Sequence, residues 1–188
     1  MTQVEDSQII ALFYERSEQA ISELIKKYGA AVKKVAANIL NNTLDVEECA
    51  NDTYLGVWNT IPPQNPNPLM TYVCKIARNL AIKKYHANTA EKRNSYYDAA
   101  LDELEETIPA LNSVESEFDA KELAAAISVF LDTLSYEDRF MFVRRYWYAD
   151  AVSDIAAMAQ TGSHRVSVRL SRTRKKLQNF LKKEGMLI

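Results

Sequence analysis

The chain has 188 residues, of which 47% are hydrophobic and 26% charged, and its formal net charge is −2. This composition can bury a core and excludes a largely disordered chain, and the length suits one mid-sized domain or two small ones. No apolar run approaches the ~20 residues of a membrane span, and no signal peptide is visible. We therefore expect a cytoplasmic protein without membrane insertion, with Cys49 and Cys74 as buried thiols.

Charge is distributed unevenly along the chain. Residues 164–188 hold eight Lys or Arg and one Glu, a net +7, and residues 61–96 hold six and one, a net +5. Between them, residues 97–122 hold nine Asp or Glu and one Lys, a net −8. Two basic modules separated by an acidic strip suit a protein that binds a polyanion at two sites. Ordinary solvated helix faces are the alternative explanation.

The first sixty residues have the apolar period of α-helices. Ser17 is placed to cap a helix whose apolar positions recur every 3.6 residues from Ile21 to Ile39. Asp45 and Glu48 have the spacing of a capping box, which predicts that the next helix opens there and runs to about residue 59.

The outward face of that second helix is acidic and carries an amide. Such a face cannot hold DNA, so it either engages a basic protein partner or is simply solvated. The residues on it are Glu47, Glu48, Asn51 and Asp52.

A proline-rich loop and a polar helix follow. Residues 62–68 contain four of the five prolines and are expected to be extended, and the next helix runs from about Leu69 to beyond Tyr85. Cations follow phosphates, while aromatic rings and amides contact exposed bases, so the polar face of this helix suits a partly unpaired strand. An amphipathic helix with solvated lysines is the alternative. The candidate residues are Tyr72, Lys75, Arg78, Asn79 and Lys83.

The acidic stretch after this helix is interpreted as a linker. We expect an all-α chain with two small domains, residues 1–95 and 121–188, joined by a linker at residues 96–120.

In the second domain the spacing of Ser135 and Asp138 predicts a capped helix start. We also hypothesise that the linker carboxylates compete with DNA for the basic faces.

The last quarter of the chain has the pattern of a helix-turn-helix. A short apolar helix near residues 152–159 is followed by a turn with Gly162 and a long helix over about 163–182. On a helical wheel Arg169, Arg172 and Lys176 lie within about 40° of Arg165, and the apolar residues Val166, Leu170, Leu177 and Leu181 form a neighbouring face. One side can pack on a core while the other presents guanidinium groups to phosphate or guanine.

Signatures of an enzyme are absent from the sequence. No two of the four glycines are close enough for a phosphate-binding loop. His86 and His164 are isolated, and Cys49 and Cys74 lack metal-ligand spacing. We expect no catalytic residues, no metal and no cofactor.

Two motifs together resemble a known family. Residues 45–58 read DVEECANDTYLGVW and residues 71–81 read TYVCKIARNLA, which resembles domain two of extracytoplasmic-function (ECF) sigma factors. Residues 166–177 read VSVRLSRTRKKL, which resembles the recognition helix of their domain four. The family's tryptophan in the second motif is Tyr72 here, and its turn glycine lies where this chain has Gln160.

The resemblance implies a promoter-specificity subunit of bacterial RNA polymerase. It implies that the acidic face from Glu47 to Asp52 binds core polymerase. The loop and the Tyr72–Lys83 face would recognise and open the minus-ten element, and the last helix would enter the major groove at the minus-thirty-five element. The residues implicated in the last contact are Ser163, His164, Arg165, Ser167, Arg169 and Arg172. The family is commonly inhibited by an anti-sigma factor, and we expect the free chain to be a monomer.

Two rival functions remain open at this point. A conventional helix-turn-helix regulator would be a homodimer that binds duplex DNA without polymerase. A helical adaptor or anti-sigma-type interaction protein would show no dependence on DNA.

Overall fold

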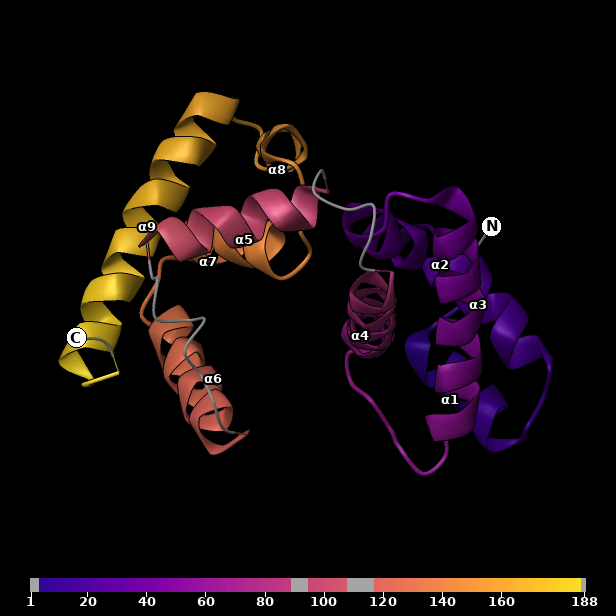
Figure 1. The fold of residues 1–188 in the computed structure, drawn as a ribbon. Coiled ribbons are helices and arrows are strands. Elements are labelled where there is room, and N and C mark those ends of the chain that lie inside the picture. Colours follow the sequence, from indigo (N-terminus) through magenta and orange to yellow (C-terminus); the bar gives the residue numbers. More distant parts are fainter. Residues whose placement is uncertain (1–3, 89–94, 108–116, 187–188) are drawn as a thin grey trace. The chain divides into compact units, whose positions relative to one another are not determined.

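The computed structural model describes residues 4–88, 95–107 and 117–186 and divides the chain into two compact units, Met1–Ser95 and Tyr96–Ile188. All regular secondary structure in these residues is helical, which confirms the predicted all-α class (Figure 1). Each unit has its own core, so each is described by itself.

The described residues of the first unit form four helices. They are α1 (Asp6–Tyr14), α2 (Gln19–Ile39), α3 (Thr43–Thr60) and α4 (Leu69–Ala87). Helices α2, α3 and α4 pack against one another and α1 packs on α2. The predicted stripes form this core, which buries Leu24 and Val32 of α2, Val57 of α3 and Val73 of α4 completely.

The close approach of α3 and α4 depends on a glycine. A β-carbon at Gly56 would lie 3.1 Å from the Ile76 side chain, which is tighter than ordinary van der Waals contact. Both cysteines are buried and are not joined in a disulfide, as expected. Burial is the main cause that raises the pKa of Cys49 to about 11, so this thiol stays protonated at neutral pH.

Two of the predicted helix caps are wrong. Helix α2 begins after Glu18, and no side chain, including that of Ser17, caps it. Helix α3 begins after Asn42, whose Oδ1 accepts from the Leu44 amide at 2.8 Å. An asparagine directly before the helix therefore occupies the position that the capping-box spacing assigned to Asp45, and Asp45 lies in the first turn.

The second unit contains five helices in the described residues. They are α5 (Tyr96–Thr107), α6 (Glu117–Asp132), α7 (Tyr136–Tyr146), α8 (Val152–Met158) and α9 (Ser163–Lys183). Ser135 caps α7 as predicted, with its Oγ accepting from the Asp138 amide at 3.2 Å.

Helix α9 is the long element on which the second unit is assembled (Figure 1). Near its start, Val166 and Leu170 pack in a cluster with Ile155 of α8 and Met141 of α7. Further along, its Leu177 and Leu181 pack with Phe130 and Phe142 of α6 and α7. The predicted apolar stripe of the last helix is therefore its buried side.

The first part of the predicted linker differs from the prediction. Tyr96–Thr107 is helix α5, which packs on α7 and α9, and α6 already begins at Glu117. Residues 108–116 of the predicted linker lie outside the described residues. Helix α5 buries Tyr97 and Ala100, and its acidic composition concealed these few apolar positions.

Glu103 joins α5 to the rest of the unit. Its carboxylate accepts from Arg145 Nη2 at 2.7 Å, from the Tyr146 hydroxyl at 2.9 Å and from Arg174 Nη1 at 2.9 Å. The side chain of Arg145 is only 5% exposed, and its Nη1 donates to the Asp150 carbonyl at 3.0 Å. Because a buried charge needs a counter-charge, Glu103 is a structural requirement of this unit.

We expect Glu103→Gln to lower the free energy of unfolding of the second unit by about 2 kcal/mol, because Arg145 then loses its counter-charge. The chain has two tryptophans, and in a Trp58→Phe background the fluorescence of Trp147 reports on this unit alone. Urea unfolding in that background measures the effect. Glu106→Gln, an exposed position on the same helix, should change stability by less than about 0.5 kcal/mol; equal effects of the two variants would contradict the role of Glu103.

Candidate nucleic-acid interface

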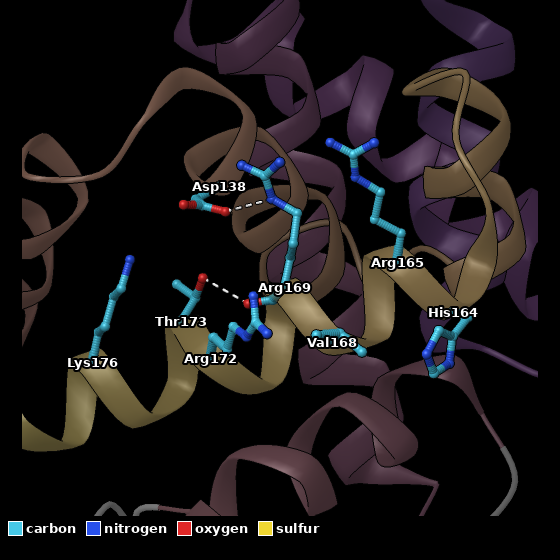
Figure 2. Close-up of a pocket in the computed structure, with 8 residues that line it drawn as sticks. All are labelled: Asp138, His164, Arg165, Val168, Arg169, Arg172, Thr173 and Lys176. Carbon is cyan, nitrogen blue, oxygen red and sulfur yellow. Dashed lines mark hydrogen bonds and ion pairs between the residues drawn. The ribbon is translucent and has the colours of Figure 1, made fainter.

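Four cations and a histidine of α9 line one hollow in the surface of the second unit. The hollow has a volume of about 460 Å³, and Figure 2 shows the side chains around it. The residues that line it are Asp138, His164, Arg165, Val168, Arg169, Arg172, Thr173 and Lys176. Arg165, Arg169, Arg172 and Lys176 therefore lie together, as the helical wheel predicted.

The remaining predicted residues of α9 lie at its start. Ser163, His164 and Ser167 are exposed in its first turns, but only His164 lines the hollow. Lys176 and Asp138 line the hollow although they were not among the predicted site residues. The wheel already placed Lys176 on this face, whereas no sequence signal connects Asp138 of α7 to it.

Among the cations of the hollow, Arg169 alone is held by carboxylates of the described part of the chain. Its Nε donates to Asp138 Oδ1 at 2.8 Å (Figure 2), and its Nη1 forms a short ion pair with Glu137. Burial raises the pKa of Asp138, but hydrogen bonds with Arg169 and Ser135 and the charge of Arg169 outweigh burial, so the net pKa lies below its usual value. The same hydrogen bond with Asp138 is the main cause that raises the pKa of Arg169.

A second hollow adjoins the first. It has a volume of about 390 Å³ and shares Arg165 with it. Glu137 and the exposed Tyr136 and Met158 lie among the residues that line it. The two carboxylates that hold Arg169 thus belong to neighbouring hollows, Asp138 to the first and Glu137 to the second.

The opposite side of α9 is closed by α5. Arg174 lies about 180° from Arg165 on the helical wheel and donates to Glu103 at 2.9 Å and to the Tyr146 hydroxyl at 2.6 Å. Burial and the charge of Glu103 raise the pKa of Tyr146. Glu103 therefore neutralises a cation that faces away from the hollow. The hypothesis that acidic linker residues compete with DNA for the basic faces therefore does not apply to Glu103.

The turn before α9 places a non-glycine residue in a left-handed conformation. Gln160 has φ of 50°, whereas Gly162 has φ of −83° and is the N-cap of α9. The turn therefore requires a positive φ where the family has its glycine, and Gln160 adopts it here at a cost of order 1 kcal/mol. Gly162 has no part in that conformation.

The first unit presents the predicted polar face on α4. Tyr72, Lys75, Asn79 and Lys83 follow one another at helical spacing along the continuous helix Leu69–Ala87. Lys75, Asn79 and Lys83 are exposed, and Tyr72 and Arg78 are partly buried. Tyr72, Lys75, Asn79 and Lys83 form a polar stripe that begins shortly after the end of the proline-rich loop.

Two residues at the end of α1 and just after it contact the start of the loop at residues 62–68 and the end of α3. The Tyr14 hydroxyl donates to the Pro63 carbonyl at 3.0 Å, and Arg16 Nη1 donates to the Trp58 carbonyl at 2.6 Å. The Arg16 guanidinium also lies 5.4 Å from the centre of the Trp58 ring. Tyr14 and Arg16 were not predicted, because they are distant in sequence from the loop that they hold.

The predicted acidic face of α3 is exposed but partly neutralised. Glu47 pairs with Lys33 at 2.7 Å, and Glu48 pairs with Lys84 at 2.6 Å. Asn51 and Asp52 are exposed on the same face. We call this the α3 face: Glu47, Glu48, Asn51 and Asp52, with Leu44 and Leu55.

Leu44 and Leu55 were not predicted and are 78% and 57% exposed. They lie on the same side of α3 as Glu48 and Asn51, by helical spacing. Two exposed leucines around an acidic centre give the surface the mixed character of a protein-protein interface.

Comparison with known proteins finds a family match within the first unit. Residues 24–91 match the family model of sigma-70 region 2. Among solved structures, the chain is similar to one described as the structure of CnrH in complex with the cytosolic domain of CnrY. That likeness has 18% identity and a TM-score of 0.45, and covers 95% of this chain and 97% of the other. At that level it carries no conclusion, and no curated protein matches the chain.

Two further features are absent from the described residues. In the ranges 4–88, 95–107 and 117–186 no helix is both long and apolar enough to cross a bilayer. Within the same ranges no group of three or more His, Cys, Asp or Glu side chains could hold a metal ion.

We expect Asp138 to make the stability of the second unit sensitive to acid. Its pKa is lower in the folded than in the unfolded chain, so its contribution of about 1 kcal/mol is complete above pH 5 and is lost as the pH falls below about 4. The difference in unfolding free energy between wild type and Asp138→Asn should therefore be largest at pH 6 and disappear near pH 2. Urea titrations followed by Trp147 fluorescence, in the Trp58→Phe background, measure it. A difference for Asp138→Asn that stays constant with pH would contradict the assignment.

Proposed function

We propose that the chain is an ECF-type sigma factor of the sigma-70 family that recognises two promoter elements and opens DNA; residues 24–91 in its first unit match the family model of sigma-70 region 2. Its general role as a sigma factor in transcription initiation follows from the family. Recognition of two elements is the finer proposal. The observation that carries it is the cation-lined hollow on α9, which lies in a separate unit from region 2.

The α9 hollow supports contact with duplex DNA at the minus-thirty-five element. Arg165 and Arg172 are exposed, and Arg169 and Lys176 lie between and beside them along one helix face. A helix with this arrangement fits the major groove, where guanidinium groups reach guanine and phosphate oxygens. Ser163, His164 and Ser167 at the start of α9 would add contacts at the groove entrance.

The α4 stripe and the loop support contact with the minus-ten element. Lys75 and Lys83 can neutralise phosphates, whereas Tyr72 and Asn79 can stack on and hydrogen-bond to unpaired bases. Arg78 lies at the side of the stripe. Because Tyr14 binds the Pro63 carbonyl and Arg16 binds the Trp58 carbonyl at the end of α3, the start of the loop has a defined position from which the loop can receive a base.

The α3 face supports docking on core RNA polymerase. Its acidic centre suits a basic partner, and Leu44 and Leu55 supply apolar area that an exclusively acidic face lacks. A cognate anti-sigma factor, as is common in the family, would be a further partner. We propose a cytoplasmic site of action and a monomeric free chain, and the family is generally non-enzymatic.

Transcription with core polymerase tests the proposal. The purified chain is added to core enzyme and to a pool of promoter fragments, and run-off products are sequenced. Transcripts that start downstream of two shared elements are the expected result. Tight, specific duplex binding by a homodimer without core enzyme would instead favour a conventional helix-turn-helix regulator.

Arg172→Ala should weaken binding of the upstream element by the holoenzyme about tenfold, because it removes one exposed cation from the α9 hollow. The slope of log affinity against log salt should also decrease by about 1 if Arg172 contacts a phosphate. Fluorescence anisotropy at several KCl concentrations measures both. Lys182→Ala removes the same charge outside the hollow and should change affinity less than twofold; an effect equal to that of Arg172→Ala would argue against the hollow as the contact surface.

Asn79→Ala should impair promoter opening while leaving binding of the closed promoter nearly unchanged, because the amide contacts bases only once they are unpaired. We expect roughly a tenfold lower yield of open complex, measured by permanganate footprinting of unpaired thymines. A template with a pre-melted minus-ten segment should restore most of the lost activity. Normal opening by the variant on duplex DNA would contradict the assigned role.

A further inference from the structure

Arg169 differs from the other cations around the α9 hollow. It is held by two carboxylates of α7, whereas Arg165, Arg172 and Lys176 have no carboxylate within ion-pair distance among the described residues. Arg169 is also the least exposed of the three arginines in the hollow, with 21% of its side chain accessible. Arg169 therefore does not present a free charge to DNA.

The geometry still leaves part of the guanidinium available. Arginine has five N–H donors. Nε donates to Asp138 and Nη1 donates to Glu137, and within the described residues no acceptor bonds to Nη2. The outer edge of the group can therefore still donate hydrogen bonds into the hollow, while its stem is held by the two carboxylates.

This arrangement discriminates between the two kinds of DNA acceptor. A phosphate that approaches Arg169 meets two negative carboxylates beside one positive guanidinium, so its net electrostatic attraction is lost. A guanine edge is neutral, and its O6 and N7 atoms need only donors at a fixed position. Fixing the guanidinium in advance also reduces the entropy lost when it binds.

We propose that Glu137 and Asp138 are positioning residues that set the DNA specificity of α9, by directing Arg169 to a base edge and away from phosphate. Asp138, which is 16% exposed, fixes the direction of the guanidinium. Glu137, which is 61% exposed, supplies the charge that repels a phosphate. The inference rests on the proposed function, since it assumes that the α9 hollow contacts DNA.

A structural tie between α7 and α9 is the simpler role for the same contacts. Such a tie would change the stability of the unit and leave the ratio of specific to non-specific binding unchanged. The ratio is therefore the measurement that separates the two roles.

The test begins with the holoenzyme formed from core polymerase and the full chain. A preferred duplex is selected from a random pool with the wild-type holoenzyme, and affinities for it and for a scrambled duplex are measured at several KCl concentrations. The variants are Glu137→Gln and Asp138→Asn, each alone and combined with Arg169→Ala. Asp132→Asn is the matched control, because it breaks another carboxylate–arginine pair of the same unit, with Arg139 at 3.2 Å, outside both hollows.

Glu137→Gln should strengthen binding of the scrambled duplex and lower the specificity ratio by roughly tenfold. The salt dependence of that non-specific binding should become steeper by about 1, since one of the two negative charges that repel a phosphate from Arg169 is then removed. Asp138→Asn should instead weaken binding of the selected duplex by roughly tenfold. With Arg169→Ala present, both carboxylate variants should have no further effect on the ratio.

The possible failures are distinguishable. If Glu137→Gln leaves the specificity ratio of a discriminating holoenzyme unchanged, or changes it equally in the Arg169→Ala background, the inference is wrong and the proposed function stands. If the wild-type holoenzyme selects no sequence from the pool and directs no specific transcription, the proposed function fails, and the inference fails with it. A circular-dichroism melt of each variant establishes that the altered chain is folded.

Discussion

The packing of the apolar stripe of α9 decides which of its cations reach solvent. Val166 and Leu170 are buried against α7 and α8, and Leu177 and Leu181 against α6 and α7. Each of these side chains contributes roughly 1.5–3 kcal/mol when fully buried, so the rotation of α9 about its axis is strongly determined. Once it is set, Arg165 and Arg172 must face outward and Arg174 must face back into the unit. The proposed DNA surface is therefore a consequence of hydrophobic packing, and the charges occupy the positions that the packing leaves.

Ion pairs with carboxylates then determine which of the outward-facing and inward-facing cations are neutralised. Glu103 of α5 pairs with Arg174 on the closed side, and Glu137 and Asp138 of α7 hold Arg169 at the hollow. The other cations of the hollow, Arg165, Arg172 and Lys176, are exposed and have no ion pair in the described residues. The first unit uses the same device, since Lys84 and Lys33 pair with the α3 face, whereas Lys75 and Lys83 on α4 are exposed. Acidic residues thus neutralise selected cations in each unit and leave the other cations of the α9 hollow and those of the α4 stripe without a carboxylate partner among the described residues.

Periodicity sufficed to predict most helices and the two faces of α9, because both depend on local spacing and on the burial of apolar residues. It failed for α5, where Tyr97 and Ala100 are buried within a strongly acidic segment. The partners of Glu103 explain the failure, since Arg145 and Arg174 are 42 and 71 residues away in sequence. Likewise Asp138 is 31 residues from Arg169. Spacing along one helix carries no information about such contacts. The charged partners of the site residues could therefore not be predicted from the sequence and are seen only in the structure.

A chain with a net charge of −2 and two small basic areas is poorly suited to bind DNA through either area alone. A few phosphate contacts give weak, salt-sensitive binding, and the carboxylates beside Arg169 reduce it further. Two such contacts on one chain become strong only when something fixes their separation, because the second contact then forms at a high effective concentration. Docking of the α3 face on core polymerase would supply that constraint. On this account weak binding by the free chain would itself be useful, since it would keep the chain from occupying DNA without polymerase.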